Sequence, residues 1–401
     1  MDRIINSLLD LDLYKLTQQQ AITKLYPWVR ARYGFFNRGQ TPFPTGFASS
    51  LREQVDAMAT LKLLPEEKEF LHQRCGEFLD PVYLDLLEGY RYDPREVHIS
   101  QSDDHLSIII EGNWYRTILW EVPLMAIVCE LYFKLAGQGI IMTEPNIASP
   151  GEMRDRAKNK AKRLAEVGAK FAEFGTRRRF SYRCHDLTME GLIAGGGANL
   201  VGSSNVHFAQ KYNIRPIGTQ AHEWIMFHGA KYGYRMANKA AMNQWVRVYK
   251  GDLGTVLTDT YTTADFWRSF DRQSAKLFDG VRHDSGDPIL FGEDTIKHYE
   301  KYRINSQSKT IIFSDGLDVN EAVRIQKHFN GRIGVSFGIG THFTNDVGVK
   351  PLNIVIKMTE AMPFSFNEWI PTIKLSDVRG KHTGDKEEIA SAIRELRLKV
   401  D

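Results

Sequence analysis

A histidine in the segment IRPIGTQAHEW, residues 214–224, stands where it could do chemistry. Residues 214–219 have the pattern of a short strand, and His222 then falls in the first turn of a predicted helix. The dipole at a helix start disfavours the charged imidazole and favours a bound anion. A histidine that is kept neutral beside a bound anion would suit a functional site. Isolated histidines more often cap or pack, so other residues must decide between these interpretations.

Six further segments read as strands, and each ends in small or polar residues. These predicted strands cover residues 170–176, 199–204, 254–260, 280–285, 309–316 and 332–340. The carboxyl ends of parallel strands meet on one face, which carries the reactive residues in barrels and open sheets alike. Together these ends predict one active site for a polyanion. The candidate residues are Phe174, Arg177, Ser203, Ser204, Arg282, Asp284, Ser314, Asp315, Gly316, Gly338, Gly340 and Thr341.

Three of these strand ends suit phosphate or ribose. SDG at 314–316 and GIGT at 338–341 contain small residues whose backbone N–H groups can face an anion, although turn glycines alone would look the same. In VRHDSGDP, residues 281–288, the guanidinium of Arg282 can donate two hydrogen bonds to a phosphate. Asp284 could orient ribose hydroxyls or a magnesium-bound water. The alternative for this segment is a charged turn with an aspartate cap before a helix.

Arginines and aromatic residues are interleaved in FGTRRRFSYR, residues 174–183. Nucleic-acid surfaces combine the same residue types, because aromatic rings stack on bases and arginines contact phosphates. The formal net charge is only +3, which argues against a nonspecific nucleic-acid binder. A flat aromatic substrate with an acidic substituent would need the same groups on a smaller scale. Phe174 would then be a stacking face, and Arg177 would bind a carboxylate or phosphate.

Strands alternate with helices from about residue 153 onward, and this order predicts parallel β-α units. With residues 214–219 included, seven strands are expected, close to the eight of a closed barrel, although an open doubly wound sheet would give a similar pattern. Residues 1–140 contain antiparallel strand patterns and helices, which predict an α+β domain. We expect residues 141–344 to form an α/β barrel and residues from about 345 to 401 to complete the N-terminal domain.

The composition is that of a globular protein. Hydrophobic residues make up 42% of the 401 residues and charged residues 25%, which excludes a disordered chain. Three widely separated cysteines give neither a zinc motif nor a disulfide framework and favour a reducing compartment. The N-terminus lacks a secretory pattern, and no apolar run has the length of a membrane span. We expect a cytoplasmic protein without membrane or nucleic-acid partners.

In combination, His222, FGTRRRFS, VRHDSGDP, SDGLD and the segment LDLYKLTQQQAITKLYP (residues 11–27) closely resemble the nicotinate phosphoribosyltransferase family over nearly the whole chain. The resemblance implies an irregular seven-stranded α/β barrel of the type II phosphoribosyltransferases, with an α+β N-terminal domain completed by the C-terminal segment. It implies a head-to-tail homodimer whose shared active sites lie at the subunit boundary.

The activity implied by the resemblance is the first step of nicotinate salvage towards NAD. Nicotinate and phosphoribosyl pyrophosphate would give nicotinate mononucleotide and pyrophosphate, in an ATP-hydrolysing ligase reaction with Mg²⁺ as cofactor. His222 would be phosphorylated by ATP. Phe174 would stack on one face of the pyridine ring, and Tyr14 of the partner subunit would cover the other. The remaining site residues would be Arg177, Arg282 and Asp284 around the pyridine and ribose, and Ser314, Asp315, Gly316, Gly338, Gly340 and Thr341 around the 5′-phosphate.

The preference between nicotinate and nicotinamide is expected to depend on the end of the strand at 199–204. Nicotinamide-using relatives carry an aspartate where Ser204 stands, next to Ser203. An aspartate accepts a hydrogen bond from a carboxamide but repels a carboxylate. With Arg177 nearby, the absence of this aspartate favours nicotinate.

Other functions fit the sequence less well. TVLTDTYTT, residues 255–263, resembles the signature of type I phosphoribosyltransferases, but Asp259 lacks the adjacent second carboxylate. AGGG at 194–197 lacks the Gly-Lys-Ser/Thr of a P-loop kinase. A quinolinate enzyme of type II would need no phosphorylatable histidine. A nucleotide-sensing or RNA-binding module built on the arginine-rich segment would bind RNA with a steep salt dependence.

Overall fold

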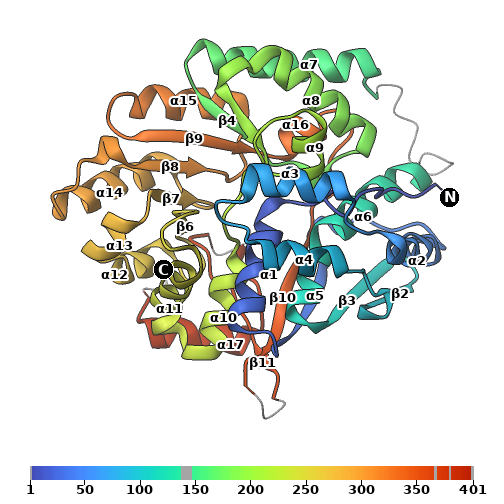
Figure 1. The fold of residues 1–401 in the computed structure, drawn as a ribbon, viewed down its shortest axis with the longest axis horizontal. Coiled ribbons are helices and arrows are strands. Elements are labelled where there is room, and N and C mark those ends of the chain that lie inside the picture. Colours follow the sequence, from blue (N-terminus) through green and yellow to red (C-terminus); the bar gives the residue numbers. More distant parts are fainter. Residues whose placement is uncertain (1, 137–146, 365–367, 379–380, 399–401) are drawn as a thin grey trace.

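Two β-sheets, one antiparallel and one parallel, form the framework of the chain (Figure 1). The computed structural model describes residues 2–136, 147–364, 368–378 and 381–398. The strands are β1 (Arg30–Asn37), β2 (Val97–Ser102), β3 (His105–Asn113), β4 (Lys170–Glu173), β5 (Leu200–Ser203), β6 (Thr255–Leu257), β7 (Gly280–His283), β8 (Thr310–Phe313), β9 (Gly334–Ile339), β10 (Ile354–Met362) and β11 (Ile370–Pro371). The α/β class predicted from the sequence is confirmed.

Helices surround both sheets, and most of those around the parallel sheet follow one of its strands. They are α1 (Leu13–Leu25), α2 (Phe47–Ala57), α3 (Pro65–Cys75), α4 (Pro81–Gly89), α5 (Trp114–Thr117), α6 (Glu121–Ala136), α7 (Pro150–Glu166), α8 (Tyr182–Gly196), α9 (Val206–Lys211), α10 (His222–Tyr232), α11 (Tyr234–Tyr249), α12 (Thr263–Ser269), α13 (Arg272–Leu277), α14 (Pro288–Lys301), α15 (Val319–Phe329), α16 (Thr341–Thr344) and α17 (Lys386–Leu396). None of the helices in the described ranges is long and apolar enough to cross a bilayer.

The antiparallel sheet joins strands from distant parts of the chain. Its order is β11-β10-β1-β3-β2, so β1 lies between β10 and β3. Arg30 of β1 pairs with Met362 of β10, and Asn37 pairs with Ile354. Buried residues alternate with partly exposed ones through most of β10, as expected for a strand packed on one face. The C-terminal segment therefore supplies two strands to a sheet that begins near residue 30.

The parallel sheet has six strands in the order β5-β4-β9-β8-β7-β6 within the described residues. The expectation of a seventh strand at residues 214–219 was wrong. This segment makes one isolated parallel bridge, between Pro216 and Ser203. Proline has no N–H to donate to a ladder. The Thr219 hydroxyl donates to the carbonyl of Thr255 at 3.1 Å, so the segment lies between β5 and β6 without regular pairing.

The start of α14, which follows β7, shows how the sequence specifies where a helix begins. Asp287 accepts hydrogen bonds from the N–H groups of Ile289 and Leu290, and Pro288 is the first helical residue. The aspartate-cap interpretation of VRHDSGDP is therefore correct for Asp287. Asp284 lies before this cap, directly after β7. In Figure 1, α14 and α15 lie beside β7, β8 and β9 at the outer side of the sheet.

The N-terminal segment lies over the end of β5 and contacts Arg179 in the loop after β4. Leu13 N donates to Ser204 O at 2.8 Å, and Val206 N donates to Leu11 O at 3.0 Å. Arg179 forms two hydrogen bonds of 2.8 Å with Asp10, and both side chains are buried. This part of the carboxyl face of the parallel sheet is therefore covered by protein.

Candidate active site

Beyond this covered part, the carboxyl face of the parallel sheet opens into a cavity of 950 Å³. Phe174 follows β4, Asp284 follows β7 and Gly338 belongs to β9, and all three line this cavity. Its acidic residues are Asp284 and Asp315, whereas its basic residues are Arg38, Arg177, Arg178, Arg282, Lys357, Lys374 and Lys381. Such an excess of positive charge attracts anionic ligands.

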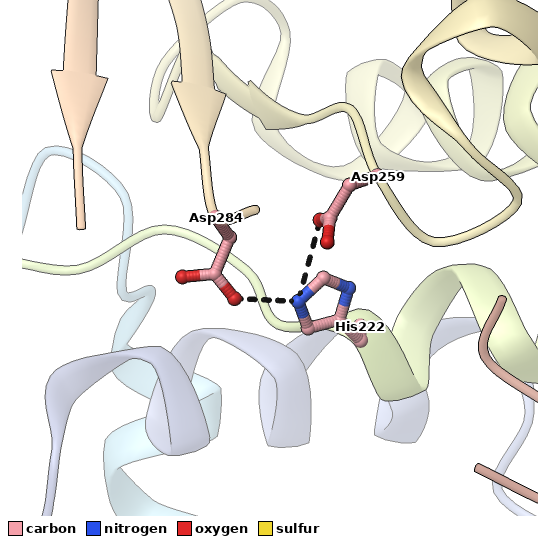
Figure 2. Close-up of side chains that lie close together, drawn as sticks. All are labelled: His222, Asp259 and Asp284. Carbon is pink, nitrogen blue, oxygen red and sulfur yellow. Dashed lines mark hydrogen bonds and ion pairs between the residues drawn. The ribbon is translucent and has the colours of Figure 1, made fainter. Parts of the chain in front are cut away.

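His222 is the first residue of α10 and lies in the wall of the cavity, so the predicted helix start is confirmed. Its Nδ1 is 3.0 Å from Thr260 Oγ1. Its Nε2 is 2.9 Å from Asp284 Oδ2 and 3.6 Å from Asp259 Oδ1. Figure 2 shows that the two carboxylates reach the ring from the segments that follow β6 and β7. Parts of the chain far apart in sequence thus hold one imidazole.

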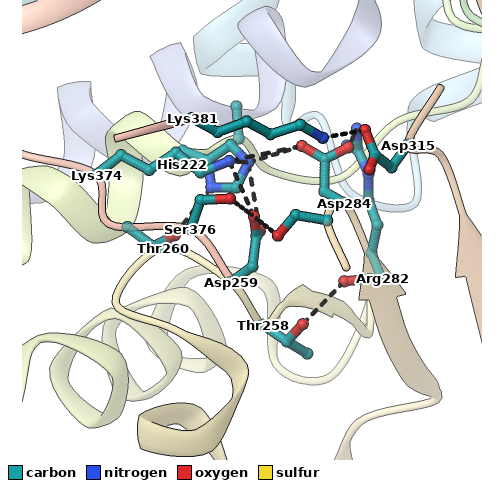
Figure 3. Close-up of polar contacts among 12 residues, drawn as sticks. His222, Thr258, Asp259, Thr260, Arg282, Asp284, Asp315, Lys374, Ser376 and Lys381 are labelled. Carbon is teal, nitrogen blue, oxygen red and sulfur yellow. Dashed lines mark hydrogen bonds and ion pairs between the residues drawn. The ribbon is translucent and has the colours of Figure 1, made fainter. Parts of the chain in front are cut away.

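Lys374 approaches the same nitrogen of His222. Its Nζ is 2.9 Å from His222 Nε2 and 2.9 Å from Asp259 Oδ2 (Figure 3). Nε2 carries either a proton or a lone pair, so it cannot donate to Asp284 and accept from Lys374 at the same time. When Nδ1 holds the proton and donates it to Thr260 Oγ1, the Nε2 lone pair faces the ammonium.

The surroundings keep His222 neutral. Burial and the charge of Lys374 lower the pKa of His222 to about 4, although the carboxylates of Asp259 and Asp284 oppose this shift. Burial alone would raise the pKa of Asp284. Arg282 and the hydrogen bond with His222 outweigh burial, and the pKa of this carboxyl lies well below its usual value. At neutral pH the site therefore contains a neutral imidazole beside an ionised carboxylate.

A second group of polar side chains covers the ends of β7 and β8. Arg282 Nε donates to Ser314 Oγ at 2.8 Å, and Ser314 Oγ donates to Asp284 Oδ1 at 2.8 Å. Lys381 and Asp315 form an ion pair nearby. These contacts orient the Arg282 and Asp284 side chains before a ligand binds, which lowers the cost of ordering them later.

The donor set does not fit a resident Mg²⁺. His222, Asp259 and Asp284 offer ligand atoms within 4.8 Å of one another. However, the Lys374 ammonium lies 2.9 Å from both His222 Nε2 and Asp259 Oδ2, where a divalent cation would have to bind. Asp284 already accepts a hydrogen bond from Ser314. Magnesium requires an octahedral set of oxygen ligands. The expected cofactor has no such set among the described side chains.

Small residues at the ends of β8 and β9 shape the cavity wall. A Cβ atom on Gly338 would lie 2.3 Å from the ring of Phe174, so any side chain here would displace that ring. Gly316 has a φ of 56°, in the left-handed region that glycine adopts without strain. Gly340 and Thr341 lie at the start of α16 and line the cavity. Both predicted phosphate loops therefore border the same cavity.

A smaller cavity of 50 Å³ lies beside Arg177 and shares several lining residues with the larger one. Tyr14, Glu121 and Lys357 belong to its wall. The Arg177 guanidinium is 5.9 Å from the centre of the Tyr14 ring. Tyr14 was expected to reach this site from a partner subunit, and this expectation was wrong. Tyr14 lines the cavity of its own chain, because α1 packs beside Gly218 and the strand end at Ser204.

Ser203 and Ser204 are the predicted site residues that border neither cavity. Ser203 Oγ donates to Glu173 Oε2 at 2.6 Å, and Ser204 Oγ donates to Asp12 Oδ1 at 2.8 Å. Both serines are buried under the N-terminal segment. Ser204 therefore does not face the cavities whose ligand preference it was expected to determine.

Four residues of the two cavities were not predicted from the sequence: Glu121, Lys357, Lys374 and Lys381. None of them follows a parallel strand, so the strand-end pattern could not identify them. Lys357 lies within β10, and Lys374 and Lys381 come from the segment that crosses from the antiparallel sheet to the cavity. Two of these lysines could have been found from the sequence, because Lys357 lies in the apolar run LNIVIKM and Lys374 in TIKLSD. A lysine that faces the interior requires a charged partner.

Comparisons with known proteins agree with this arrangement. The profile of the nicotinate phosphoribosyltransferase (NAPRTase) N-terminal domain matches residues 9–129, and that of the NAPRTase family matches residues 169–397. The nicotinate phosphoribosyltransferase of Chromohalobacter salexigens is 54% identical over 395 residues, which cover 98% of this chain and 99% of that protein. The nicotinate phosphoribosyltransferase of Desulforapulum autotrophicum is 52% identical over 393 residues, with the same coverage.

Solved structures show the same similarity. The crystal structure of nicotinate phosphoribosyltransferase from Porphyromonas gingivalis has a TM-score of 0.94 at 46% identity, covering 98% of this chain and 100% of that one. The structure of the Vibrio cholerae protein of the same name has a TM-score of 0.90 at 33% identity, covering 100% and 95%. The chain belongs to the nicotinate phosphoribosyltransferase family.

Proposed function

We propose that this chain transfers the phosphoribosyl group of phosphoribosyl pyrophosphate to nicotinate, with release of pyrophosphate, and couples this transfer to ATP hydrolysis. The observation that carries the proposal is the neutral imidazole of His222, with Nδ1 beside Thr260 and Nε2 beside Lys374, in the wall of a cationic cavity. The positive charge suits all three substrates, because each is an anion. Family membership and the names of the relatives support the choice of nicotinate.

In this proposal ATP phosphorylates His222. With the ring proton on Nδ1, the lone pair of Nε2 forms a bond to the γ-phosphorus, and the bond to the bridging oxygen breaks to release ADP. Lys374 lies 2.9 Å from Nε2 and would balance the charge of the transferred group. Water then cleaves the phosphohistidine to inorganic phosphate and free histidine, so the enzyme is regenerated.

Phosphoribosyl transfer depends chiefly on position and charge. Pyrophosphate leaves C1 of the ribose through a cation-like state, and the ring nitrogen of nicotinate forms the new bond. Phe174 would stack on the pyridine ring, and Arg282 with Asp284 would face the ribose. The loops containing Gly316 and Gly340 would bind the 5′-phosphate through backbone N–H groups.

The remaining parts of the proposal concern ions and assembly. Mg²⁺ would enter with the pyrophosphate of the substrate, since the carboxylates of the cavity have cationic or hydroxyl partners. Residues 214–219, lying between β5 and β6, support an irregular closed barrel. The pairing of β1 with β10 supports one domain made of residues 1–140 and 345–401, beside a catalytic domain of residues 141–344. If the protein forms a homodimer, Tyr14 stays in the site of its own chain. The three cysteines are buried and separate from one another, which supports a cytoplasmic setting.

The test is incubation with nicotinate and phosphoribosyl pyrophosphate, with and without ATP, while pyrophosphate and the nucleotide product are measured. We expect nicotinate mononucleotide and pyrophosphate in equal amounts, and a higher yield with ATP. Pyrophosphate release without the nucleotide would contradict the proposed transfer. RNA binding that weakens steeply with salt would instead favour the nucleic-acid module.

A further inference from the structure

Among the residues that the structure describes, two cations of the small cavity, Arg177 and Lys357, lack close hydrogen-bond partners. The carboxylates nearest to the Arg177 guanidinium are those of Glu121 at 3.6 Å and Asp12 at 3.7 Å, beyond hydrogen-bond distance. Within the described ranges, no carboxylate oxygen lies within 4.0 Å of the Lys357 ammonium, although Glu121 acts on it electrostatically. Charges held this way in a protein wall are costly unless an anion joins them.

The other carboxylates of this cavity are already bound to protein groups. Glu223 pairs with Lys15 at 2.5 Å and accepts hydrogen bonds from Tyr33 and Trp114. Glu121 pairs with the same ammonium, also at 2.5 Å. Lys15 thus neutralises part of the acidic charge. The positive charges of Arg177 and Lys357 remain available to a ligand.

The rest of the wall is apolar and suits a flat ring. Met226, Leu257, Ile356 and Met358 line the small cavity, and the Tyr14 ring forms part of its boundary. Arg177 and Lys357 also line the larger cavity, so both stand where the two cavities meet. A small aromatic acid at this junction would place its ring against apolar side chains and its carboxylate against the two cations.

We propose that Lys357, together with Arg177, binds the carboxylate of nicotinate and so selects it over the neutral carboxamide. This inference rests on the proposed function and names the residue that determines its specificity. The ammonium donates to one carboxylate oxygen and the guanidinium donates to the other. A carboxamide offers one oxygen acceptor and presents N–H donors to a cation, so it loses one of these bonds.

Ligand binding at this position has a protonation signature. Burial lowers the pKa of Lys357 to about 8, and Glu121 opposes this shift. The other charges facing the ammonium are those of Arg177 and Lys374, which lower the pKa, and of Asp284, which raises it. A bound carboxylate favours the charged ammonium and raises its pKa. Nicotinate binding at about pH 8.5 therefore takes up protons from solution.

Steady-state kinetics of Lys357→Met test the assignment, because methionine keeps the apolar length of the side chain and removes its charge. We expect the KM for nicotinate to rise about 10- to 150-fold, the loss of one charge-assisted hydrogen bond, while the KM for phosphoribosyl pyrophosphate is unchanged. Lys357→Arg retains most of the affinity. Lys297→Met, at a side chain 71% exposed on α14, is the matched control and behaves as wild type. An increase confined to the KM for phosphoribosyl pyrophosphate would assign Lys357 to phosphate and overturn the inference, as would unchanged kinetics.

Calorimetric titration with nicotinate, in buffers that differ in ionisation enthalpy, gives a readout without turnover. At about pH 8.5 the wild type takes up protons on binding and Lys357→Met does not. Equal uptake by both proteins contradicts the inference even if the variant is less active, and matching thermal melts show that both are folded. A wild type that binds nicotinate but does not turn it over contradicts the proposed function alone.

Discussion

The covered strand end of β5 and the open strand ends of β7 and β8 carry similar side chains in different surroundings. At the covered end, Ser203 and Ser204 donate to buried carboxylates, and the N-terminal segment lies on top of them. At the open ends, Ser314 donates to Asp284 in the wall of the large cavity. The polar residues alone do not distinguish the two regions. The segment packed above each strand end determines whether its side chains hold the fold together or face a ligand.

The two regions also balance charge differently. At the covered end the buried carboxylate of Asp10 has a charged partner from the chain itself, Arg179. At the open ends cations exceed acids, and part of their charge faces the cavity. Substitutions at the covered end should therefore change stability, and those at the open ends should change binding and catalysis.

The largest expected effect is at the open ends, on substitution His222→Asn. Wild-type protein incubated with ATP labelled in the γ-phosphate should acquire an acid-labile, base-stable phosphate, and the variant should acquire none, because asparagine has no nucleophilic ring nitrogen. ATP-independent transfer should persist at a reduced level, since substrate positioning does not require the phosphate. The exposed His105→Asn serves as control. Undiminished labelling of His222→Asn would place the nucleophile elsewhere.

A large effect on stability is expected at the covered end for Arg179→Met. This change leaves the Asp10 carboxylate buried without its charged partner, which costs about 3–5 kcal/mol of unfolding free energy. Urea unfolding measures the loss, and the KM for nicotinate of the folded fraction should not change. Arg95→Met removes an exposed ion pair and should cost far less. Similar losses of unfolding free energy in Arg179→Met and Arg95→Met would show that the buried ion pair is no more important than the exposed one.

The two serines give the most direct comparison. Ser314→Ala should lower kcat/KM for phosphoribosyl pyrophosphate about 10- to 150-fold, because Arg282 and Asp284 each lose a hydrogen bond. Ser204→Ala should leave kcat/KM close to wild type and cost about 1–3 kcal/mol of unfolding free energy, because Asp12 is left short of a donor. The reverse result would show that Ser204 meets substrate.

The smallest expected effect is that of pH on labelling by ATP. The pKa of His222 in the fold is about 4 rather than the ordinary 6.5, so the neutral nucleophile persists as the pH falls. The initial labelling rate should be level between about pH 8 and about pH 5.5. Because the unfolded chain binds this proton more readily, stability should decrease as the pH falls below 6.5 towards 4. A labelling rate that falls to half its maximum near pH 6.5 would mean that His222 is solvated and has the ordinary histidine pKa.

The sequence predicted those site residues that belong to a regular pattern. His222, Arg282, Asp284 and Gly338 stand at strand ends or helix starts, where turn chemistry and periodicity are readable. Lys374 could not be found this way, because its place beside His222 depends on how the C-terminal segment crosses the sheet.

The wrong expectations have equally specific causes. The apolar spacing of residues 214–219 suggested a strand, but Pro216 cannot donate to a ladder. Ser204 was placed in the site because its strand end has the same composition as the others, and nothing local records that the N-terminal segment covers it. Covering segments are long-range features that periodicity does not contain.

The pairing of β1 with β10 has a consequence for biosynthesis. Residues 30–37 emerge from the ribosome long before residues 354–362, and at about 5–20 residues per second the wait for β10 lasts roughly 15 to 65 seconds. During this interval β1 can pair only with β3, and its other edge is open to foreign strands. Lys374 emerges later still, so the ribosome-bound nascent chain has His222 without its ammonium neighbour. The growing polypeptide needs protection against aggregation at that edge, and its site is incomplete until Lys374 has emerged.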